Sequence, residues 1–323
     1  MFLATCISVN GADENSTTLP QQYSVKVVSF LDGNAEEKGL TVGLANVKNH
    51  VCTDDGCNGS INLNKEKVLR VIDQLKEYKV NMILFPEFSL TGYFWGFDDV
   101  SNSKKGHYNS KKTSPDCWNY MNEGVLDLHL DWLKVVQSKL DGSLKYIIFN
   151  SIRNGPRKGN ATQLDNKFLN STYVIDENFN CDNLSANEET HIYDKTFLPG
   201  IEKLYTITGQ RDFLIIKTDW GNFGFTTCYD MCFSQLYQEY DLAHKIDGII
   251  QLASWRGPAL RRYNITPKPI VNQNYYGFQW DLMASDRAAT NQVWLLPMRW
   301  DIKRKVGTTF GETLVYGHHQ EYV

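Results

Sequence analysis

Residues 223–230, FGFTTCYD, decide the fold that we expect for this chain of 323 residues. The apolar residues predict a short strand that ends in a sharp turn, with Cys228 at its tip and a helix over 233–244. Backbone N–H groups and the helix dipole favour a thiolate, or an oxyanion, at such a point. The alternative is a buried structural cysteine, because a free cysteine packs as a small hydrophobe.

Length and composition indicate a globular α/β protein. The 323 residues can bury a full core, and the formal net charge of −4 provides no basic surface for nucleic acid or for an anionic membrane. No apolar run reaches the roughly 18 residues that a membrane span needs. We therefore expect a soluble chain with no nucleic-acid partner and no membrane span.

Several features favour a secreted, periplasmic or lumenal location over a cytoplasmic one. Residues 1–9 are largely apolar and have the character of a signal remnant. In an oxidising compartment, Cys52 could be bridged to Cys57 and Cys232 to Cys228. Six sequons for N-glycosylation occur, at Asn15, Asn58, Asn160, Asn170, Asn183 and Asn264.

Strand and helix patterns alternate along most of the chain. Residues 1–38 are expected to form an extension outside the core, which leaves 39–323 as a single domain. A strand, a helix and a strand in succession predict a right-handed crossover unit, and the pattern recurs. A loop rich in Pro and Arg is expected over 254–270. The predicted strands are 40–47, 80–85, 146–151, 171–175, 214–218, 223–227, 248–252 and 292–296, and the predicted helices are 65–78, 126–140, 233–244 and 278–290.

Three polar residues stand at or near the ends of apolar runs, where a parallel sheet places its active site. Glu87 follows the run 82–86, Lys195 lies within 192–199, and Cys228 ends the run quoted above. A carboxylate can take the thiol proton, the thiolate can attack a carbonyl carbon, and an ammonium can stabilise the oxyanion. Each charge alone could equally be a solvated residue or an ion pair, so the interpretation depends on their joint occurrence.

Three motifs together resemble the nitrilase, or carbon–nitrogen hydrolase, superfamily: PEFSLTGY at 86–93, YDK at 193–195 and GFTTCYD at 224–230. The likeness runs from about residue 40 to about residue 310. It implies an α/β fold of the four-layer αββα sandwich type, and a homodimer or higher homo-oligomer. It also implies thiol-dependent hydrolysis of a non-peptide carbon–nitrogen bond in a small-molecule substrate of the amide type.

The resemblance implies catalytic roles for individual residues. Glu87, Lys195 and Cys228 match the Glu–Lys–Cys triad of the family. Glu202 is similar to an additional acidic residue of amidase- and carbamoylase-like members and would orient Lys195 and the substrate amine; the alternative is an ordinary loop carboxylate. The backbone N–H of Tyr229 would hold the oxyanion together with Lys195. No HExxH, paired CxxC or Gly-rich phosphate loop occurs, and no histidine lies in a recognisable motif, so no metal or other cofactor and no Cys–His protease is expected.

Residues near the cysteine narrow the expected substrate to a small linear amide or an N-carbamoyl compound. Tyr229 and Asp230 resemble amidase-like and carbamoylase-like members, whereas true nitrilases usually carry Trp-Glu there. Carbamoylases that act on D-amino acids tend to place arginines where this chain has Met231 and Cys232, which argues against that substrate class.

Four residues are expected to contact the substrate. Tyr93 belongs to an aromatic group that could wall an apolar pocket, and Ser254, Trp255 and Arg256 form a second segment in which the arginine could bind an acidic group. The alternatives are core aromatics and a solvated basic loop. Other function classes also stay open: a non-catalytic binding protein of the same fold, a pantetheinase- or biotinidase-like secreted amidase, and acyl transfer to an amine instead of water.

Overall fold

The computed structural model describes residues 3–11, 23–31, 39–47, 57–92, 130–155, 168–200, 202–204, 206–209, 213–256, 261–263, 270–272 and 275–302. Its larger sheet contains the strands β1 (Leu3–Gly11), β2 (Tyr23–Leu31), β3 (Leu40–Val47), β4 (Met82–Leu84), β5 (Tyr146–Asn154), β6 (Phe168–Ile175) and β7 (Ile192–Asp194), in that order. β3, β4 and β5 are parallel, and the strands on either side of this group pair antiparallel.

The second sheet has the strand order β13-β10-β9-β8, in which β8 is Ile215–Thr218, β9 is Gly221–Thr227, β10 is Gly248–Arg256 and β13 is Trp294–Ile302. β13, β10 and β9 run parallel, and β8 forms an antiparallel hairpin with β9. Two short strands, β11 (Arg261–Tyr263) and β12 (Ile270–Asn272), pair with each other.

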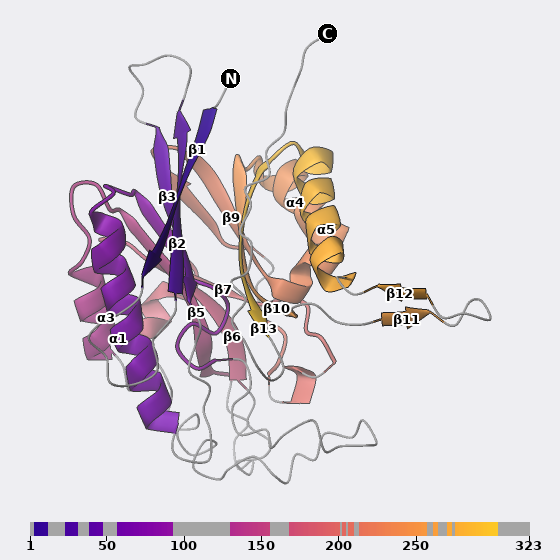
Figure 1. Ribbon diagram of the computed structural model, residues 1–323. Helices are drawn as coiled ribbons and strands as arrows, with labels where there is room; N and C mark the ends of the chain where they lie inside the picture. The colour runs from indigo at the N-terminus through magenta and orange to yellow at the C-terminus, as the bar shows by residue number, and fades with distance from the viewer. Residues whose placement is uncertain are drawn as a thin grey trace.

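Helices cover the outer face of each sheet (Figure 1). α1 (Cys57–Lys76) and α3 (Leu130–Gln137) lie on the seven-stranded sheet, and α4 (Ser234–His244) and α5 (Tyr275–Asn291) lie on the four-stranded sheet. The two sheets face each other, so the layers follow the order αββα. This confirms the predicted single-domain four-layer sandwich. Among the described helices, none is both long enough and apolar enough to cross a membrane.

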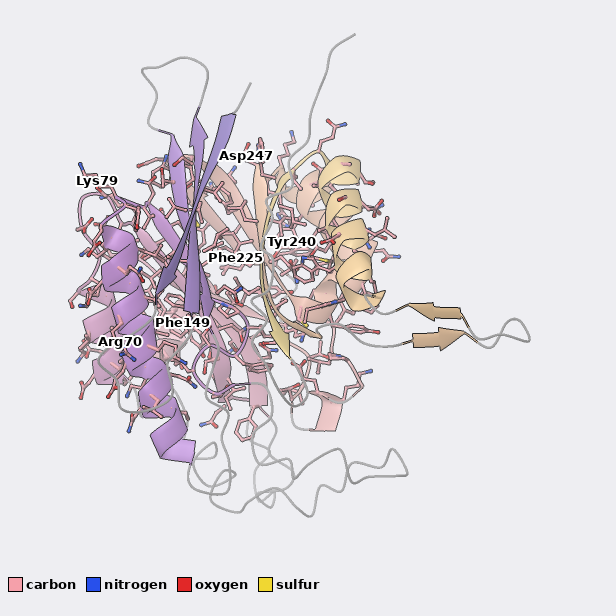
Figure 2. All side chains as sticks on the ribbon, viewed as in Figure 1. Arg70, Lys79, Phe149, Phe225, Tyr240 and Asp247 are labelled. Carbon is pink, nitrogen blue, oxygen red and sulfur yellow. The ribbon has the colours of Figure 1, made fainter. Side chains whose placement is uncertain are left out.

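The alternation of side chains along the strands separates three apolar layers. Phe149 of β5 packs beneath α1 and α3, whereas the preceding Ile148 points toward the second sheet. Phe225 of β9 lies between the sheets, and Tyr240 of α4 packs on the outer face of the smaller sheet. Figure 2 labels Phe149, Phe225 and Tyr240 in these three successive layers. The site residues described below lie at strand ends, next to the layer between the sheets.

The expectation that residues 1–38 lie outside the core is wrong for the described part of that segment. β1 and β2 extend the larger sheet beyond β3, and Val25, Val27 and Val28 are buried. Val25 and Val27 join the helix-covered layer, whereas Val28 faces the second sheet. The apolar run in β2 is flanked by polar segments, so its sequence alone did not indicate that it is part of the core. Its burial depends on pairing with β3, which a local sequence pattern does not show.

Most other predicted elements are found, with shifted boundaries. α1 begins at Cys57 rather than at residue 65. The predicted start was too late because the buried polar residue Asn64 interrupts the apolar periodicity that starts at Ile61. The Asn64 side chain donates a hydrogen bond to the carbonyl of Leu90 at 2.7 Å. β10 continues into the expected loop 254–270, because it pairs with β13 as far as Arg256.

Candidate active site

Glu87 lies in a tight turn shortly after β4 and is completely buried. The next residue, Phe88, has a left-handed φ of 56°, which a non-glycine residue adopts only when its surroundings hold it. Asn150 of β5 supplies two restraints: its Oδ1 accepts from Phe88 N–H at 2.8 Å, and its carbonyl accepts from Ser89 N–H at 2.8 Å. β5 therefore determines where the Glu87 side chain points.

Cys228 stands at the junction between β9 and a 3-10 helix, Cys228–Cys232, and has a left-handed φ of 49°. The buried carboxylate of Asp230 caps this turn, since its Oδ2 accepts from Thr227 N–H at 2.8 Å. Its Oδ1 accepts from the N–H of Phe197 at 2.7 Å. Asp230 thus links the cysteine turn to the loop that follows β7.

Lys195 directly follows β7 and is only 1% exposed. Its N–H donates to the Asn170 carbonyl of β6 at 2.9 Å, and its own carbonyl accepts from Gly209 N–H at 3.0 Å. On the preceding residue, the two carboxylate oxygens of Asp194 accept from Arg153 at 3.1 and 2.5 Å. These contacts fix the point at which the lysine side chain leaves the sheet.

The side chains from these loops meet in one buried cluster. Lys195 Nζ donates to Glu87 Oε1 at 2.8 Å and to Glu202 Oε2 at 2.6 Å. Asn170 Nδ2 donates to the same Glu87 Oε1 at 2.8 Å and to Glu202 Oε1 at 2.7 Å. The N–H of Ser254 donates to Glu87 Oε2 at 2.8 Å. Three of the residues singled out from the sequence, Glu87, Lys195 and Glu202, therefore lie in direct or bridged contact.

The Cys228 thiol borders this cluster. It donates a long hydrogen bond to the carbonyl oxygen of Ser254 at 3.9 Å, and the N–H of the same residue donates to Glu87 Oε2. Burial, and then the charge of Glu87, raise the pKa of this thiol well above its usual range, although Lys195 acts in the opposite direction. The expected thiolate is thus not favoured in the free protein, because burial of the thiol raises its pKa. The thiol is protonated at rest and needs a base.

Burial and charge act differently on the other members of the cluster. Burial alone would lower the pKa of Lys195, but the charges of Glu202 and Glu87 raise it well above its ordinary value, so the side chain stays cationic. Burial raises the pKa of Glu202 to about 7 against the opposing effect of Lys195. Burial also raises the pKa of Asp230 to about 6. Two buried carboxyl groups therefore titrate between weakly acidic and neutral pH.

The raised pKa of Glu202 predicts a pH-dependent stability. Between about pH 4.5 and about pH 7 the folded chain keeps a proton at Glu202 that the unfolded chain releases. The stabilisation from this group is complete below about pH 4.5 and is lost as the pH rises through about 7. Glu202→Gln removes the titration. In urea unfolding across this pH range, wild type should lose on the order of 3 kcal/mol relative to the variant; a difference that is constant, or that grows in favour of wild type, would contradict this expectation.

Gly209 packs against the backbone that carries Lys195. A Cβ at this position would lie 2.5 Å from the Asp194 carbonyl oxygen, which is closer than real side chains approach backbone atoms. Gly209→Ala should therefore displace Lys195, lower the free energy of unfolding by about 1–3 kcal/mol and slow reactions of the Cys228 thiol. Gly200→Ala is the matched control, because among the described residues no heavy atom lies within 4 Å of a Cβ there. Equal unfolding midpoints for the two variants would show that the close approach is not a constraint.

The residues of β10 that are expected to contact the substrate lie in surroundings that differ from one another. Ser254 lies in the site, where its hydroxyl also donates to the Glu87 carbonyl at 2.9 Å. Trp255 is buried with its ring centroid 5.2 Å from that of Trp280 in α5, within the apolar cluster that also contains the cysteine. The side chain of Arg256 and the whole of Tyr93 lie outside the described residues. Contact between these residues and a substrate stays a prediction.

Tyr229, Cys228, Cys232 and Asn170, for which the sequence predicts an oxyanion donor or a modification, all lie within the described residues. The N–H of Tyr229 belongs to the first turn of the 3-10 helix, where N–H groups lack an acceptor within the helix. Cys228 and Cys232 are both free thiols, and the possible 52–57 bridge involves residues outside the described part. Asn170, counted above among the sequons, is buried between two carboxylates and cannot carry a glycan in the folded chain.

Several polar residues that hydrogen-bond to the site residues were not among the predicted site residues. Asn150, Asn170 and Gln251 each interrupt an apolar strand, and a buried amide in such a run has to be hydrogen-bonded. Gln251 donates to the Cys228 carbonyl at 3.2 Å, and its Oε1 accepts from Tyr237 at 2.6 Å. A polar residue within an apolar strand was therefore the sequence signal that could have identified these supporting residues. Among the described residues, no three His, Cys, Asp or Glu side chains are grouped to hold a metal ion.

Two facing sheets, with a buried glutamate–lysine cluster beside a cysteine at a strand end, define an αββα protein with the groups needed for acyl transfer. The family model for carbon-nitrogen hydrolases matches residues 58–319. This chain therefore belongs to the carbon–nitrogen hydrolase family and, with it, to the nitrilase superfamily. Membership supports carbon–nitrogen bond hydrolysis as the general class of reaction.

Solved structures with the same fold are similar to the chain at low sequence identity. Nit3 from Saccharomyces cerevisiae, a member of branch 10 of the nitrilase superfamily, is 14% identical, with a TM-score of 0.53 over 86% of this chain and 82% of that one. A mutant of the amidase from Nesterenkonia sp. AN1, with the acetamide moiety of fluoroacetamide added covalently at its active-site cysteine, is 12% identical, with a TM-score of 0.53 over 83% of this chain and 80% of that one.

The glutamine-dependent NAD+ synthetase from Acinetobacter baumannii is 16% identical, with a TM-score of 0.51 over 80% of this chain. The present chain spans only 38% of the length of that synthetase. A search of curated protein sequences finds no significant match. At these identities the structural likeness concerns the fold alone.

Proposed function

We propose that this protein hydrolyses a non-peptide carbon–nitrogen bond in a small linear amide or N-carbamoyl compound through a cysteine thioester. One arrangement carries the proposal: Ser254 lies between the thiol and the carboxylate, because its carbonyl oxygen is 3.9 Å from Cys228 Sγ and its N–H donates to Glu87 Oε2 at 2.8 Å, while Lys195 Nζ lies 2.8 Å from Glu87 Oε1. A nucleophile, a base and a fixed cation therefore share one buried site. This combination supports nucleophilic acyl transfer and is not needed to stabilise a fold.

In the first half of the proposed reaction, the thiol proton passes to Glu87 while the sulfur electron pair attacks the substrate carbonyl carbon. The carbonyl oxygen gains the charge, and the Lys195 ammonium and the Tyr229 N–H stabilise it. When the carbon–nitrogen bond breaks, the nitrogen leaves with the proton that Glu87 held. The products of this half are the thioester on Cys228 and ammonia or an amine.

In the second half, Glu87 takes a proton from water, whose oxygen attacks the thioester carbon. The carbon–sulfur bond breaks, and the proton returns from Glu87 to Cys228. Glu202 contacts Lys195 Nζ at 2.6 Å and acts as a positioning group that keeps the ammonium in place. The raised pKa of the thiol suits this scheme, because the proton passes to Glu87 as the sulfur attacks.

The substrate class rests on the residues after the cysteine. Tyr229 and Asp230 are similar to those of amidase- and carbamoylase-like members, and the Nesterenkonia enzyme, an amidase, offers an analogy for amide chemistry on the same fold. Homo-oligomer formation and export from the cytoplasm stay predictions from the sequence.

Selective alkylation of Cys228 tests this proposal against a non-catalytic role. Iodoacetamide at neutral pH, followed by peptide mass spectrometry, should modify Cys228 at least about tenfold faster than Cys181, because Glu87 provides a base and Cys181 is a buried thiol without one. An ammonia-release screen across amides, N-carbamoyl compounds and nitriles then identifies the substrate. Equal, slow modification of both thiols would favour a binding protein of the same fold.

A further inference from the structure

We infer that Asn170 is a positioning residue that holds Glu87 so that the thiol proton is received at Oε2 and not at Oε1. This inference rests on the proposed function and assigns a role to an amide that the reaction scheme does not use. Two observations support it. The two oxygens of the buried Glu87 carboxylate accept different numbers of hydrogen bonds, and the backbone N–H of Phe88 determines how the side-chain amides of Asn150 and Asn170 are oriented.

The acceptor sites of the two Glu87 oxygens are filled unequally. Oε1 accepts from Lys195 Nζ at 2.8 Å and from Asn170 Nδ2 at 2.8 Å, which occupies both of its lone-pair directions. Oε2 accepts from Ser254 N–H at 2.8 Å, which leaves one direction for a further proton. The Cys228 thiol lies 3.9 Å from the carbonyl oxygen of Ser254, the residue whose own N–H binds Oε2. Transfer therefore breaks the S–H bond and forms an O–H bond at Oε2.

A chain of amides determines the orientation of Asn170. The N–H of Phe88 can only donate, so the Asn150 oxygen faces it at 2.8 Å. The Asn150 NH2 group then donates to Asn170 Oδ1 at 2.8 Å. This turns the Asn170 NH2 group toward the acceptor-only carboxylates of Glu87 and Glu202. The chain of contacts closes on itself, because Phe88 follows Glu87 directly, and the base is held from both its backbone and its side chain.

The charged groups around Glu87 define what an altered Asn170 would do. Lys195 contacts Glu87 directly, the charge of Glu87 acts on the Cys228 thiol, Glu202 faces Glu87 across Asn170, and Asp230 acts on the charge of Lys195. Loss of the two Asn170 N–H donors removes stabilisation from both carboxylates and frees Oε1. A third carboxylate at this position would also disfavour ionisation of the other two, since like charges repel. Either change disfavours the ionised form of Glu202, which accepts from Asn170 at 2.7 Å, and lets Glu87 present the wrong oxygen.

The test measures iodoacetamide alkylation of Cys228 against pH by peptide mass spectrometry, in the full-length chain. Asn170→Asp keeps the shape and the acceptor for Asn150, and Asn170→Leu removes both donors. In both variants the alkylation rate at neutral pH should fall about tenfold or more, and the acidic limb of the profile should move about one pH unit upward. Asn170→Asp should give the larger shift.

Thr172→Val is the matched control. Thr172 is buried on the same strand and accepts from Asn150 Nδ2 at 3.1 Å, but none of its hydrogen bonds described here reaches a carboxylate. It should lower the unfolding midpoint without moving the pH profile. An unchanged limb in both Asn170 variants, with wild-type Cys228 still reacting rapidly, would overturn the inference and leave the proposed function standing. Wild-type Cys228 reacting no faster than Cys181 would overturn the proposed function, and the inference with it.

Discussion

Replacing Cys228 by alanine should reduce carbon–nitrogen bond hydrolysis by roughly 10⁴-fold or more, because the proposed reaction forms its covalent intermediate on this sulfur. The free energy of unfolding should change by only about 1 kcal/mol, since the side chain is small and the turn is held by Asp230 and by Gln251, not by the thiol. The measurement is ammonia release from the substrate that the screen identifies, with urea unfolding in parallel.

Cys232→Ala is the matched control for this variant. Cys232 is a free, partly buried thiol in the same 3-10 helix, and it has no contact with Glu87 among the interactions described above. Its replacement should leave the rate within about twofold of wild type, the usual range for a substitution outside the reacting groups. Retention of hydrolysis in the Cys228→Ala chain would rule out the thioester.

Lys195→Met should have the largest combined effect on stability and activity. The substitution leaves the fully buried carboxylates of Glu87 and Glu202 without their shared cation, and breaking a buried ion pair from one side costs about 3–5 kcal/mol. The rate of hydrolysis should also fall by about 10²–10³-fold or more, because the oxyanion loses its charged partner. Urea unfolding and the ammonia-release rate measure the two effects.

The double variant Lys195→Met/Glu202→Gln separates these effects. Removing one of the two carboxylates relieves the charge imbalance, so the double variant should recover part of the lost stability without recovering activity. Recovery of both stability and activity would mean that Lys195 serves only to neutralise the two glutamates. No recovery of stability would mean that the repulsion between Glu87 and Glu202 is not the origin of the loss.

Local patterns in the sequence were sufficient to predict most strands and helices and three members of the site, whereas the four layers and Glu202 were implied only by the resemblance to the nitrilase superfamily. Glu87, Lys195 and Cys228 each stand at or near the end of a strand-like apolar run, and the ends of such runs gather at one edge of a sheet. The observed contact between Glu87 and Lys195 at 2.8 Å agrees with that reasoning, whereas their roles in catalysis stay a proposal.

The partners that orient these groups could not be predicted, because each comes from a different strand. Asn150 and Asn170 meet only when β5 pairs with β6, and Asp230 reaches Phe197 only when the two sheets face each other. The raised pKa of the Cys228 thiol was missed for the same reason: helix geometry is local, but burial by surrounding elements is not. The position of β2 in the core likewise depends on a partner strand, β3, beyond the reach of a local pattern.

In the proposed reaction, Cys228 carries the acyl group during turnover. The most direct test is acid quenching of the protein during hydrolysis of an amide found by the screen, followed by peptide mass spectrometry. We expect one acyl group on the peptide that contains Cys228, removable by hydroxylamine as a thioester is, and absent from the Lys195→Met chain. Sustained turnover with that peptide unmodified, or with the acyl group on another residue, would contradict it.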